Sequence, residues 1–262
     1  MPDLLVRWSG NHKPHTSNTM NSNIYFIIGG VAVVFIIYMI FLQRMMKKKQ
    51  QGELENFNIN HSGNPLTEAQ KRLLTFGAIL FYNRMEKILG IAPEKQLATY
   101  AHGLSQQWEI SNSAEAKETL NDLLDLKRSS EFEAFVSQPS SDLSRIQKDI
   151  AKGLGIELSV VEQTKSAYGW DICRAVSLAK WCYWCGYLTE AETWNIMEKA
   201  AAIANQHGKD WTDYTISFLL GRTIQGFDLD DLIIEAKQIL SGKGPALRKI
   251  ADTDVFLRYS FS

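Results

Sequence analysis

The feature that most constrains the fold is an uncharged apolar stretch near the N-terminus, IYFIIGGVAVVFIIYMIFL, at residues 24–42. A transmembrane helix needs about 20 predominantly apolar residues to cross about 30 Å of hydrocarbon, and this stretch meets that requirement. Tyr25 and Tyr38 lie near its ends, where amphipathic rings favour the membrane interface. We therefore predict a single transmembrane helix over residues 24–42, which makes the lipid bilayer an expected partner.

A cleaved secretory signal peptide is the alternative interpretation of this stretch. Signal peptides combine a short basic segment, an apolar stretch of about 7–15 residues and a cleavage site of small residues. Here the polar leader is long, the apolar stretch is longer, and QRMMKKK follows it without a cleavage pattern. These differences favour an uncleaved anchor.

The basic residues that flank the stretch predict its orientation. Arg44 and residues 47–49 are basic and follow it, whereas only Arg7 and Lys13 precede it. Because basic flanks stay in the cytoplasm, we expect residues 1–23 to form a short extracytoplasmic tail and the large C-terminal part to be cytoplasmic. Three cysteines in 262 residues do not form a disulfide framework, which agrees with a reducing compartment.

The remainder of the chain has the composition of a globular domain. Hydrophobic residues make up 45% of the sequence and charged residues 22%, values that suit a protein with a sizeable core. The formal net charge is −1, so nothing in the overall charge attracts nucleic acid, and we expect none as a partner. Residues 43–64 are basic and then polar without periodicity, which predicts a linker before a domain at residues 65–262.

The domain is expected to consist of helices with clear caps. Thr67 and Gln70 form a capping box, and the apolar pattern after them predicts a helix that ends at Gly90. Residues 252–262 are expected to add a short strand or to pack against the helices. Strand alternation is too short elsewhere to predict a sheet, so the fold class is all-α: an N-terminal transmembrane helix plus a compact multi-helix soluble domain. Further helices are predicted over 93–108, 112–126, 142–153, 168–185, 189–207, 210–222 and 232–240.

A C-x-x-C pair, Cys182 and Cys185, raises the possibility of redox chemistry or metal binding. Helical spacing of about 100° per residue places these two thiols on one side and Cys173 on the opposite side. The pair comes just before the helix stop at Gly186, where the helix dipole opposes thiolate formation. Structural zinc needs four ligands, and the sequence offers no second pair. We expect buried thiols that pack as small hydrophobes, with redox and metal sites as weaker alternatives, and predict neither metal nor cofactor.

Three charged residues lie in the predicted helix 168–185, which is apolar almost all round and should be central. Asp171 and Arg174 are three residues apart and can meet on one face. Arg174 also shares a ridge with Trp170 and Trp181, on which a guanidinium can stack. Lys180 lies on the opposite side and is expected to reach solvent along its stem.

This charged cluster has two interpretations. In the first it is a buried ion-pair network that fixes helix register, from which loss of one partner costs about 3–5 kcal/mol. In the second it is an anion or substrate pocket in which Arg174 and Arg222 bind and Asp171 or a glutamate acts as base. The lack of an accompanying nucleophile or metal set favours the first. The candidate catalytic residues are Asp171, Arg174 and Arg222, and the candidate substrate-binding residues are Trp170, Trp181, Glu190 and Glu192.

The segments GWDICRAVSLAKWCYWCGYLTEAETW and FLLGR combine a Trp-Asp-x-x-Arg start, a basic-Trp pair, a Gly-Tyr-Leu turn, an acidic helix start and a Leu-Gly-Arg ending. In these features residues 168–226 resemble the bacterial domain-of-unknown-function family 1266. The family usually has small residues where Cys182 and Cys185 stand, which argues against a function of the thiols. The resemblance implies a fold and a shared polar cluster, but no reaction. The residues that carry the resemblance are Trp170, Asp171, Arg174, Lys180, Trp181, Gly186, Tyr187, Leu188, Glu190, Glu192, Leu220, Gly221 and Arg222.

The leading functional hypothesis is a single-pass interaction or regulatory module, held on the cytoplasmic face of a bacterial inner membrane and bound to an unidentified protein. The alternative is an enzyme, a hydrolase or transferase that acts on an anionic substrate through the Asp/Arg cluster. A third is a component of an interbacterial toxin or immunity system. A solvent-reachable cavity in which both arginines and a carboxylate converge would favour the enzyme, whereas sealed and paired side chains would favour the module.

Overall fold

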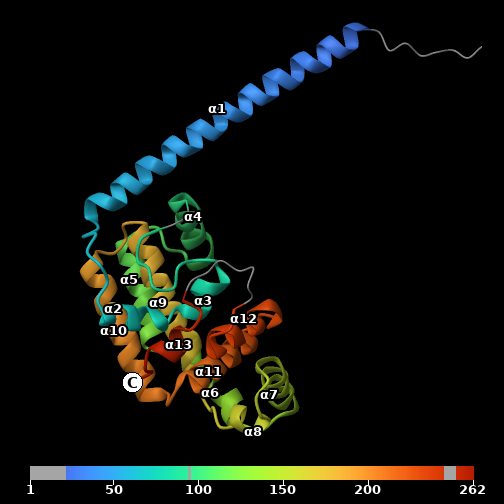
Figure 1. Ribbon diagram of the computed structural model, residues 1–262. Helices are drawn as coiled ribbons and strands as arrows, with labels where there is room; N and C mark the ends of the chain where they lie inside the picture. The colour runs from blue at the N-terminus through green and yellow to red at the C-terminus, as the bar shows by residue number, and fades with distance from the viewer. Residues whose placement is uncertain (1–21, 94–95, 245–251) are drawn as a thin grey trace, which may run out of the picture. The chain divides into compact units, whose positions relative to one another are not determined.

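The computed structural model describes residues 22–93, 96–244 and 252–262 (Figure 1). Across these ranges every regular element is a helix, which confirms the predicted all-α class. The chain divides into two units, residues 1–49 and 50–262. The predicted extracytoplasmic tail, with Arg7 and Lys13, lies outside the described residues except for its last two positions.

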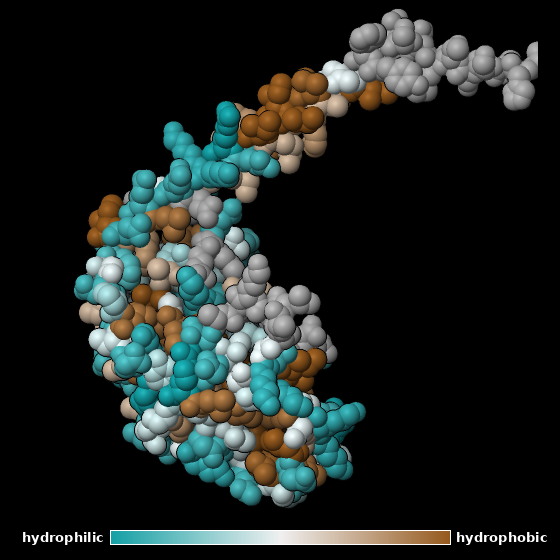
Figure 2. Space-filling model, in the orientation of Figure 1, coloured by the Kyte–Doolittle hydropathy of each residue, from teal (hydrophilic) through white to brown (hydrophobic). Residues whose placement is uncertain are grey.

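The first unit consists, where described, of most of α1 (Ser22–Asn60). Within the described part of the chain, Ile28–Lys49 is the one helical stretch long and apolar enough to cross a membrane. Its apolar side chains are exposed, as at Val34 (67%) and Phe35 (61%). Figure 2 shows this apolar band followed by hydrophilic residues. α1 therefore contains a candidate membrane span, which overlaps the predicted span over residues 28–42.

The helix continues further into the expected linker than the sequence indicated, because α1 ends only at Asn60. The end of α1 and the residues after it belong to the second unit, where they pack on α9. Phe57 is 6% exposed and meets the Tyr183 ring edge-on, with 5.2 Å between ring centroids. His61 Nδ1 lies 2.8 Å from Tyr183 Oη. A single apolar residue in a polar segment shows no periodicity, so the burial of Phe57 could not be predicted from the sequence.

The helices of the second unit surround α9, whose residues are all buried. α9 packs mainly against α10, α11 and α5, as Figure 1 shows. The predominance of apolar residues on all sides of this helix predicted its central position correctly. The helices after α1 are α2 (Glu68–Thr75), α3 (Ala78–Asn83), α4 (Leu97–Trp108), α5 (Ser113–Leu124), α6 (Lys127–Ser137), α7 (Ser141–Leu154), α8 (Leu158–Val161), α9 (Tyr168–Trp184), α10 (Glu190–His207), α11 (Trp211–Ile224), α12 (Asp230–Ser241) and α13 (Val255–Arg258).

The predicted helix from Thr67 to Gly90 is wrong in its length. Its capping box of Thr67 and Gln70 is present, but α2 ends at Thr75 and α3 at Asn83. The break between them allows almost every residue from Leu73 to Tyr82 to be buried, whereas one straight helix would expose part of this run. α6 and α8 were not predicted, and residues 255–258 form a short helix that packs on Trp211 through Phe256.

Gly169 sets the distance between α9 and α11. A Cβ atom at this position would lie 2.5 Å from the carbonyl oxygen of Tyr214 and 2.9 Å from the backbone nitrogen of Phe218. Backbone atoms cannot rotate away as a flexible side chain can. The amide of Gly169 also donates to Ser217 Oγ at 2.9 Å, so the first turn of α9 is attached directly to α11.

We therefore expect Gly169→Ala to destabilise the protein by about 1–3 kcal/mol, despite the higher helix propensity of alanine. Gly103, within α4, has no neighbour within 4 Å of a built Cβ, and Gly103→Ala should instead stabilise by up to about 1 kcal/mol. Urea unfolding of both variants measures the difference. Equal effects of the two substitutions would contradict the close α9–α11 packing.

Candidate functional site

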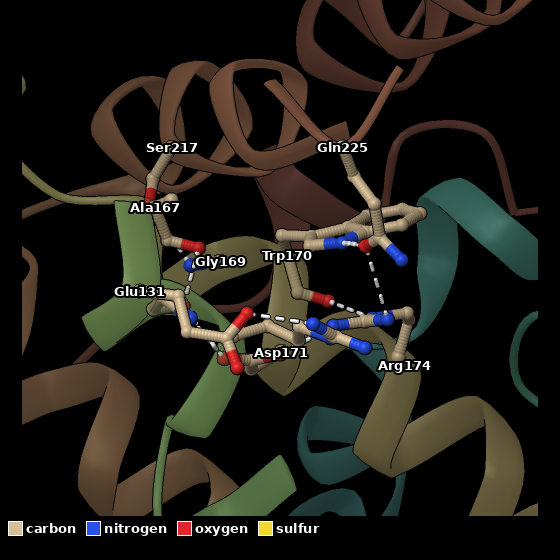
Figure 3. Close-up of polar contacts among 10 residues, drawn as sticks. Glu131, Ala167, Gly169, Trp170, Asp171, Arg174, Ser217 and Gln225 are labelled. Atoms are coloured by element: carbon tan, nitrogen blue, oxygen red, sulfur yellow. Dashed lines mark hydrogen bonds and ion pairs between the residues drawn. The ribbon is translucent and has the colours of Figure 1, made fainter. Parts of the chain in front are cut away.

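Asp171 forms a buried ion pair with Arg174 in the first turns of α9 (Figure 3). The carboxylate is fully buried. Its Oδ1 accepts from the Arg174 guanidinium, and its Oδ2 accepts from the Ser129 amide at 2.8 Å and from the Ser129 hydroxyl at 2.7 Å. Ser129 lies in α6, so this carboxylate joins two helices that are 42 residues apart in the chain.

Arg174 is held by several groups at once and is 7% exposed. Its Nε donates to the Trp170 carbonyl at 3.2 Å, and a terminal nitrogen lies 3.4 Å from Gln225 Oε1. The guanidinium carbon lies 4.3 Å from the ring centroid of Trp170 and 5.6 Å from that of Trp108. Burial lowers the pKa of Arg174, whereas Asp171 acts in the opposite direction. A guanidinium stays protonated under such conditions, so Arg174 carries its charge at this buried position.

Arg174 lies at a hollow of about 870 Å³, which we call the Arg174 hollow. Aromatic, basic and acidic side chains all line it, and three of its acids form ion pairs with three of its bases: Asp122 with Lys127, Glu131 with Arg128, and Asp171 with Arg174. The lining residues are Leu80, Asn83, Arg84, Gln106, Gln107, Trp108, Glu109, Thr119, Asp122, Leu123, Lys127, Arg128, Glu131, Trp170, Asp171, Arg174, Trp181, Arg222, Gln225 and Phe227.

Three helix ends around this hollow have strained backbones. Met85 after α3, Glu109 after α4 and Leu126 before α6 have φ angles of 58°, 57° and 53°. The left-handed region costs a residue with a Cβ about 1–2 kcal/mol, and such residues cluster at ligand sites. Each of the three is a lining residue or is next to one. At Met85 and Glu109 the left-handed residue is followed by an amide that closes the helix end, from Glu86 to Phe81 and from Ile110 to Leu104, so these turns shape the wall of the hollow.

The other predicted site residues are divided between places. Arg222 lines the Arg174 hollow, where its Nε donates to the Asp228 carbonyl at 3.0 Å and its guanidinium lies 5.2 Å from the Phe227 ring centroid. Trp181 also lines it. The guanidinium carbon of Arg84 lies 4.3 Å from the centroid of the Trp181 ring. The structure thus brings both of these residues to the hollow of Arg174, with different immediate partners.

Glu190 and Glu192 lie at the opposite end of α9, in the first turn of α10. Glu190 accepts from the amide and hydroxyl of Ser62 at 3.0 Å each. Glu192 completes the capping box of Thr189 and lies 2.6 Å from Lys117 Nζ. Lys117 and Thr189 lower the pKa of Glu192 to about 2. Glu190 therefore binds the residues that follow α1, and Glu192 caps the start of α10. Neither residue lies near Asp171.

Lys180 does not reach solvent, so that prediction is wrong. The side chain is 1% exposed. Its Nζ donates to the Lys87 carbonyl at 2.8 Å, lies 3.9 Å from Glu86 Oε2 and lies 3.9 Å from the ring centroid of Phe81. The segment after α3 covers this side of α9, and the sequence predicted that segment as part of a straight helix.

Glu86 is a second buried carboxylate, 2% exposed, which the sequence did not reveal. It accepts from Tyr100 Oη at 2.6 Å and from Trp181 Nε1 at 3.1 Å to each oxygen. Burial, and next the charge of Glu86, raise the pKa of Tyr100. Glu86 and Lys180 therefore join the segment after α3 to both α4 and α9.

The three cysteines are free thiols, and Cys173 and Cys182 are buried. Burial raises the pKa of Cys173 to about 12 and also raises that of Cys182, so neither is poised as a thiolate. Across the described ranges there is no group of three or more His, Cys, Asp or Glu side chains that could hold a metal ion. The environment of these thiols favours the packing interpretation.

Cys182→Ala should cost about 1 kcal/mol through lost contacts, and Cys182→Ser about 1–3 kcal/mol because a hydroxyl would be buried there without its water partners. Denaturant unfolding of both variants checks this order, with Cys185→Ala, at a half-buried position, as the control. A serine variant as stable as the wild type would refute tight apolar packing around Cys182.

The geometry defines a class of protein: an all-helical domain whose buried central helix supports a tryptophan-lined hollow, preceded by a candidate membrane-spanning helix. Among known families, one described as "Protein of unknown function (DUF1266)" matches residues 103–233, half of the 262-residue chain. The chain belongs to this family. The matched part includes every lining residue of the Arg174 hollow except Leu80, Asn83 and Arg84. No curated protein and no solved structure matches the chain.

Proposed function

We propose that this protein is a membrane-anchored binding module that docks a partner protein on the face around the Arg174 hollow. The observation that carries the proposal is the pair of accessible aromatic side chains at the hollow, the half-buried Trp108 and the exposed Phe227, which the buried stack of Arg174 on Trp170 supports from behind. Tryptophan and arginine are the side chains that most often dominate binding energy in protein interfaces.

The surroundings of this stack suit an interface. The pairing of Arg174 with Asp171 fixes the guanidinium in advance, so little side-chain freedom remains to be lost when a partner binds. The Asp122–Lys127 and Glu131–Arg128 pairs supply a polar rim around the aromatic side chains. An apolar centre with a polar rim is the usual anatomy of a protein interface.

The same geometry supports binding over catalysis. A general base must come within hydrogen-bond reach of the proton that it removes. Both oxygens of Asp171 already accept hydrogen bonds, from Arg174 and Ser129, and the carboxylate is fully buried. In this arrangement Asp171 serves as a positioning residue for Arg174.

Anchoring is proposed from the span Ile28–Lys49. The basic residues at 44 and 47–49 favour a cytoplasmic position for the helical domain. The bacterial inner membrane is the expected location, on the basis of the family resemblance.

Site-specific photocrosslinking in the source cells tests the proposal. A benzophenone amino acid at Gln106 or Phe227, both exposed residues of the Arg174 hollow, should give one shared adduct in the membrane fraction. The same probe at Lys199, exposed on α10 and outside the Arg174 hollow, should not give it. No adduct at either hollow position, or the same adduct from Lys199, would refute docking at this face.

A further inference from the structure

Four basic side chains follow the apolar part of the candidate membrane span. Arg44, Lys47, Lys48 and Lys49 lie within α1 and are all exposed, and we call them the basic collar. We propose that the basic collar binds the phosphate headgroups of anionic phospholipids and so selects the lipids around α1. This inference rests on the proposed anchoring of α1, but it does not depend on partner docking at the Arg174 hollow.

The positive charge of the basic collar is not neutralised within the chain. No Asp or Glu occurs between residues 22 and 52 of the sequence. Across the described residues, the structure records no ion pair and no side-chain hydrogen bond for any of the four basic side chains. Four like charges within six positions repel one another, and negative charge from outside the chain relieves this repulsion.

Helical structure gives the basic collar the form of a ring. The sequence predicted a linker from residue 43, whereas α1 continues through the collar and ends only at Asn60. At about 100° per residue, the four side chains spread over about 200° of the helix circumference. A partner protein would contact one face of the helix, whereas lipids surround a membrane helix on all sides. The spread of charge therefore favours lipid as the ligand.

The basic collar also has the height of a headgroup layer. From Arg44 to Lys49 the helix rises by about 7.5 Å, and the headgroup layer on each side of a bilayer is about 5–7.5 Å thick. Met45 and Met46 are exposed apolar side chains between the basic positions, so the edge of the hydrocarbon falls at this level. From there Arg44 can extend its stem toward the interface. Figure 2 shows the hydrophilic residues directly after the apolar band.

The charge of the collar favours an anionic headgroup over a zwitterionic one. A zwitterionic headgroup carries a cation beside its phosphate, and the collar has no carboxylate to pair with that cation. A lipid with net negative charge keeps the full attraction, which raises its local concentration by about fivefold for each basic side chain near the surface. Phosphatidylglycerol is therefore a suitable anionic probe, and phosphatidylcholine is its zwitterionic counterpart.

Electron paramagnetic resonance of spin-labelled lipids tests the proposal on the full-length protein in phosphatidylcholine vesicles. Trace spin-labelled phosphatidylglycerol or phosphatidylcholine is added in parallel, and the motionally restricted fraction measures how much of each lipid contacts the protein. At low salt, phosphatidylglycerol should be enriched about fivefold over phosphatidylcholine. The enrichment should fall below about twofold at 1 M salt, where charges are screened within about 3 Å.

Two variants that lose the same number of positive charges separate the collar from net charge. One replaces all four collar residues with glutamine and should lose the enrichment. The other combines Lys148→Gln, Lys152→Gln, Lys165→Gln and Lys199→Gln, all at exposed positions of the second unit, and should keep it. A third variant, in which arginine replaces the three collar lysines, should also keep it because the charge is retained.

Flotation of the vesicles in alkaline carbonate separates failure of this proposal from failure of anchoring. A wild-type protein that the vesicles do not retain would contradict the anchor and, with it, lipid binding by the collar. A retained protein that associates equally with both lipids would overturn the collar proposal alone, as would an enrichment that persists in the glutamine variant of the collar. Loss of the enrichment on addition of millimolar glycerol 3-phosphate at constant ionic strength would also overturn it, because the collar would then bind a soluble phosphate.

Discussion

Replacing Asp171 with alanine is expected to lower the free energy of unfolding of the helical unit by about 3–5 kcal/mol. The substitution leaves the Arg174 guanidinium 7% exposed without its counter-ion, and the Ser129 amide without its acceptor. An unpaired buried charge is far more costly than the loss of a surface contact. Urea unfolding of the detergent-solubilised protein, followed by tryptophan fluorescence, measures the change.

Two comparison variants show whether the loss of stability comes from the buried, unpaired charge. Asp171→Ala combined with Arg174→Met removes both charges, and it should be more stable than the single variant because no lone charge remains buried. Asp122→Ala breaks an exposed pair with Lys127 and should have little effect, since exposed pairs contribute little. If Asp171→Ala were as mild as Asp122→Ala, the pair could not be the buried support that the geometry indicates.

Lys180→Met should have an effect of similar size, about 3–5 kcal/mol, although the sequence suggested a solvent-reaching side chain. Methionine fits the apolar stem but leaves Glu86 2% exposed without the ammonium 3.9 Å away. The Lys87 carbonyl also loses its donor. The same unfolding measurement applies, and a loss below about 1 kcal/mol would show that Lys180 reaches water in solution.

A paired substitution tests whether the cost comes from the lone carboxylate. Glu86→Gln keeps an acceptor for Tyr100 and Trp181 but removes the charge. Combined with Lys180→Met, it should recover a large part of the stability that the single lysine variant loses. If the double variant instead loses as much unfolding free energy as the two single variants added together, the two residues do not interact.

The parts of the fold that the sequence predicted are those set by local signals. The largely apolar sequence of residues 168–185 predicted α9 and its central position, and the capping box of Thr189 and Glu192 predicted the start of α10. The Asp171–Arg174 pair and the stacking of Arg174 on Trp170 follow from spacings of three and four residues on one helix. These interactions need no knowledge of what else packs nearby.

The parts that the sequence did not predict depend on distant segments. Helical geometry gives the side on which Lys180 lies, but not that residues 93 positions earlier cover that side. Ser129 and Gln225, which complete the Arg174 site, are 42 and 51 residues from their partners. The break after Thr75 is favoured by tertiary burial on several sides, which overrides the periodic pattern of a single helix.

Asp171 and Arg174 support from within the hollow that we propose receives a partner. Arg222→Gln tests this most directly, because Arg222 lines the hollow and is only partly buried. The variant should unfold within about 0.5 kcal/mol of the wild type, yet the crosslinked adduct from Gln106 should fall by about tenfold or more. An unchanged adduct yield at unchanged stability would contradict the account.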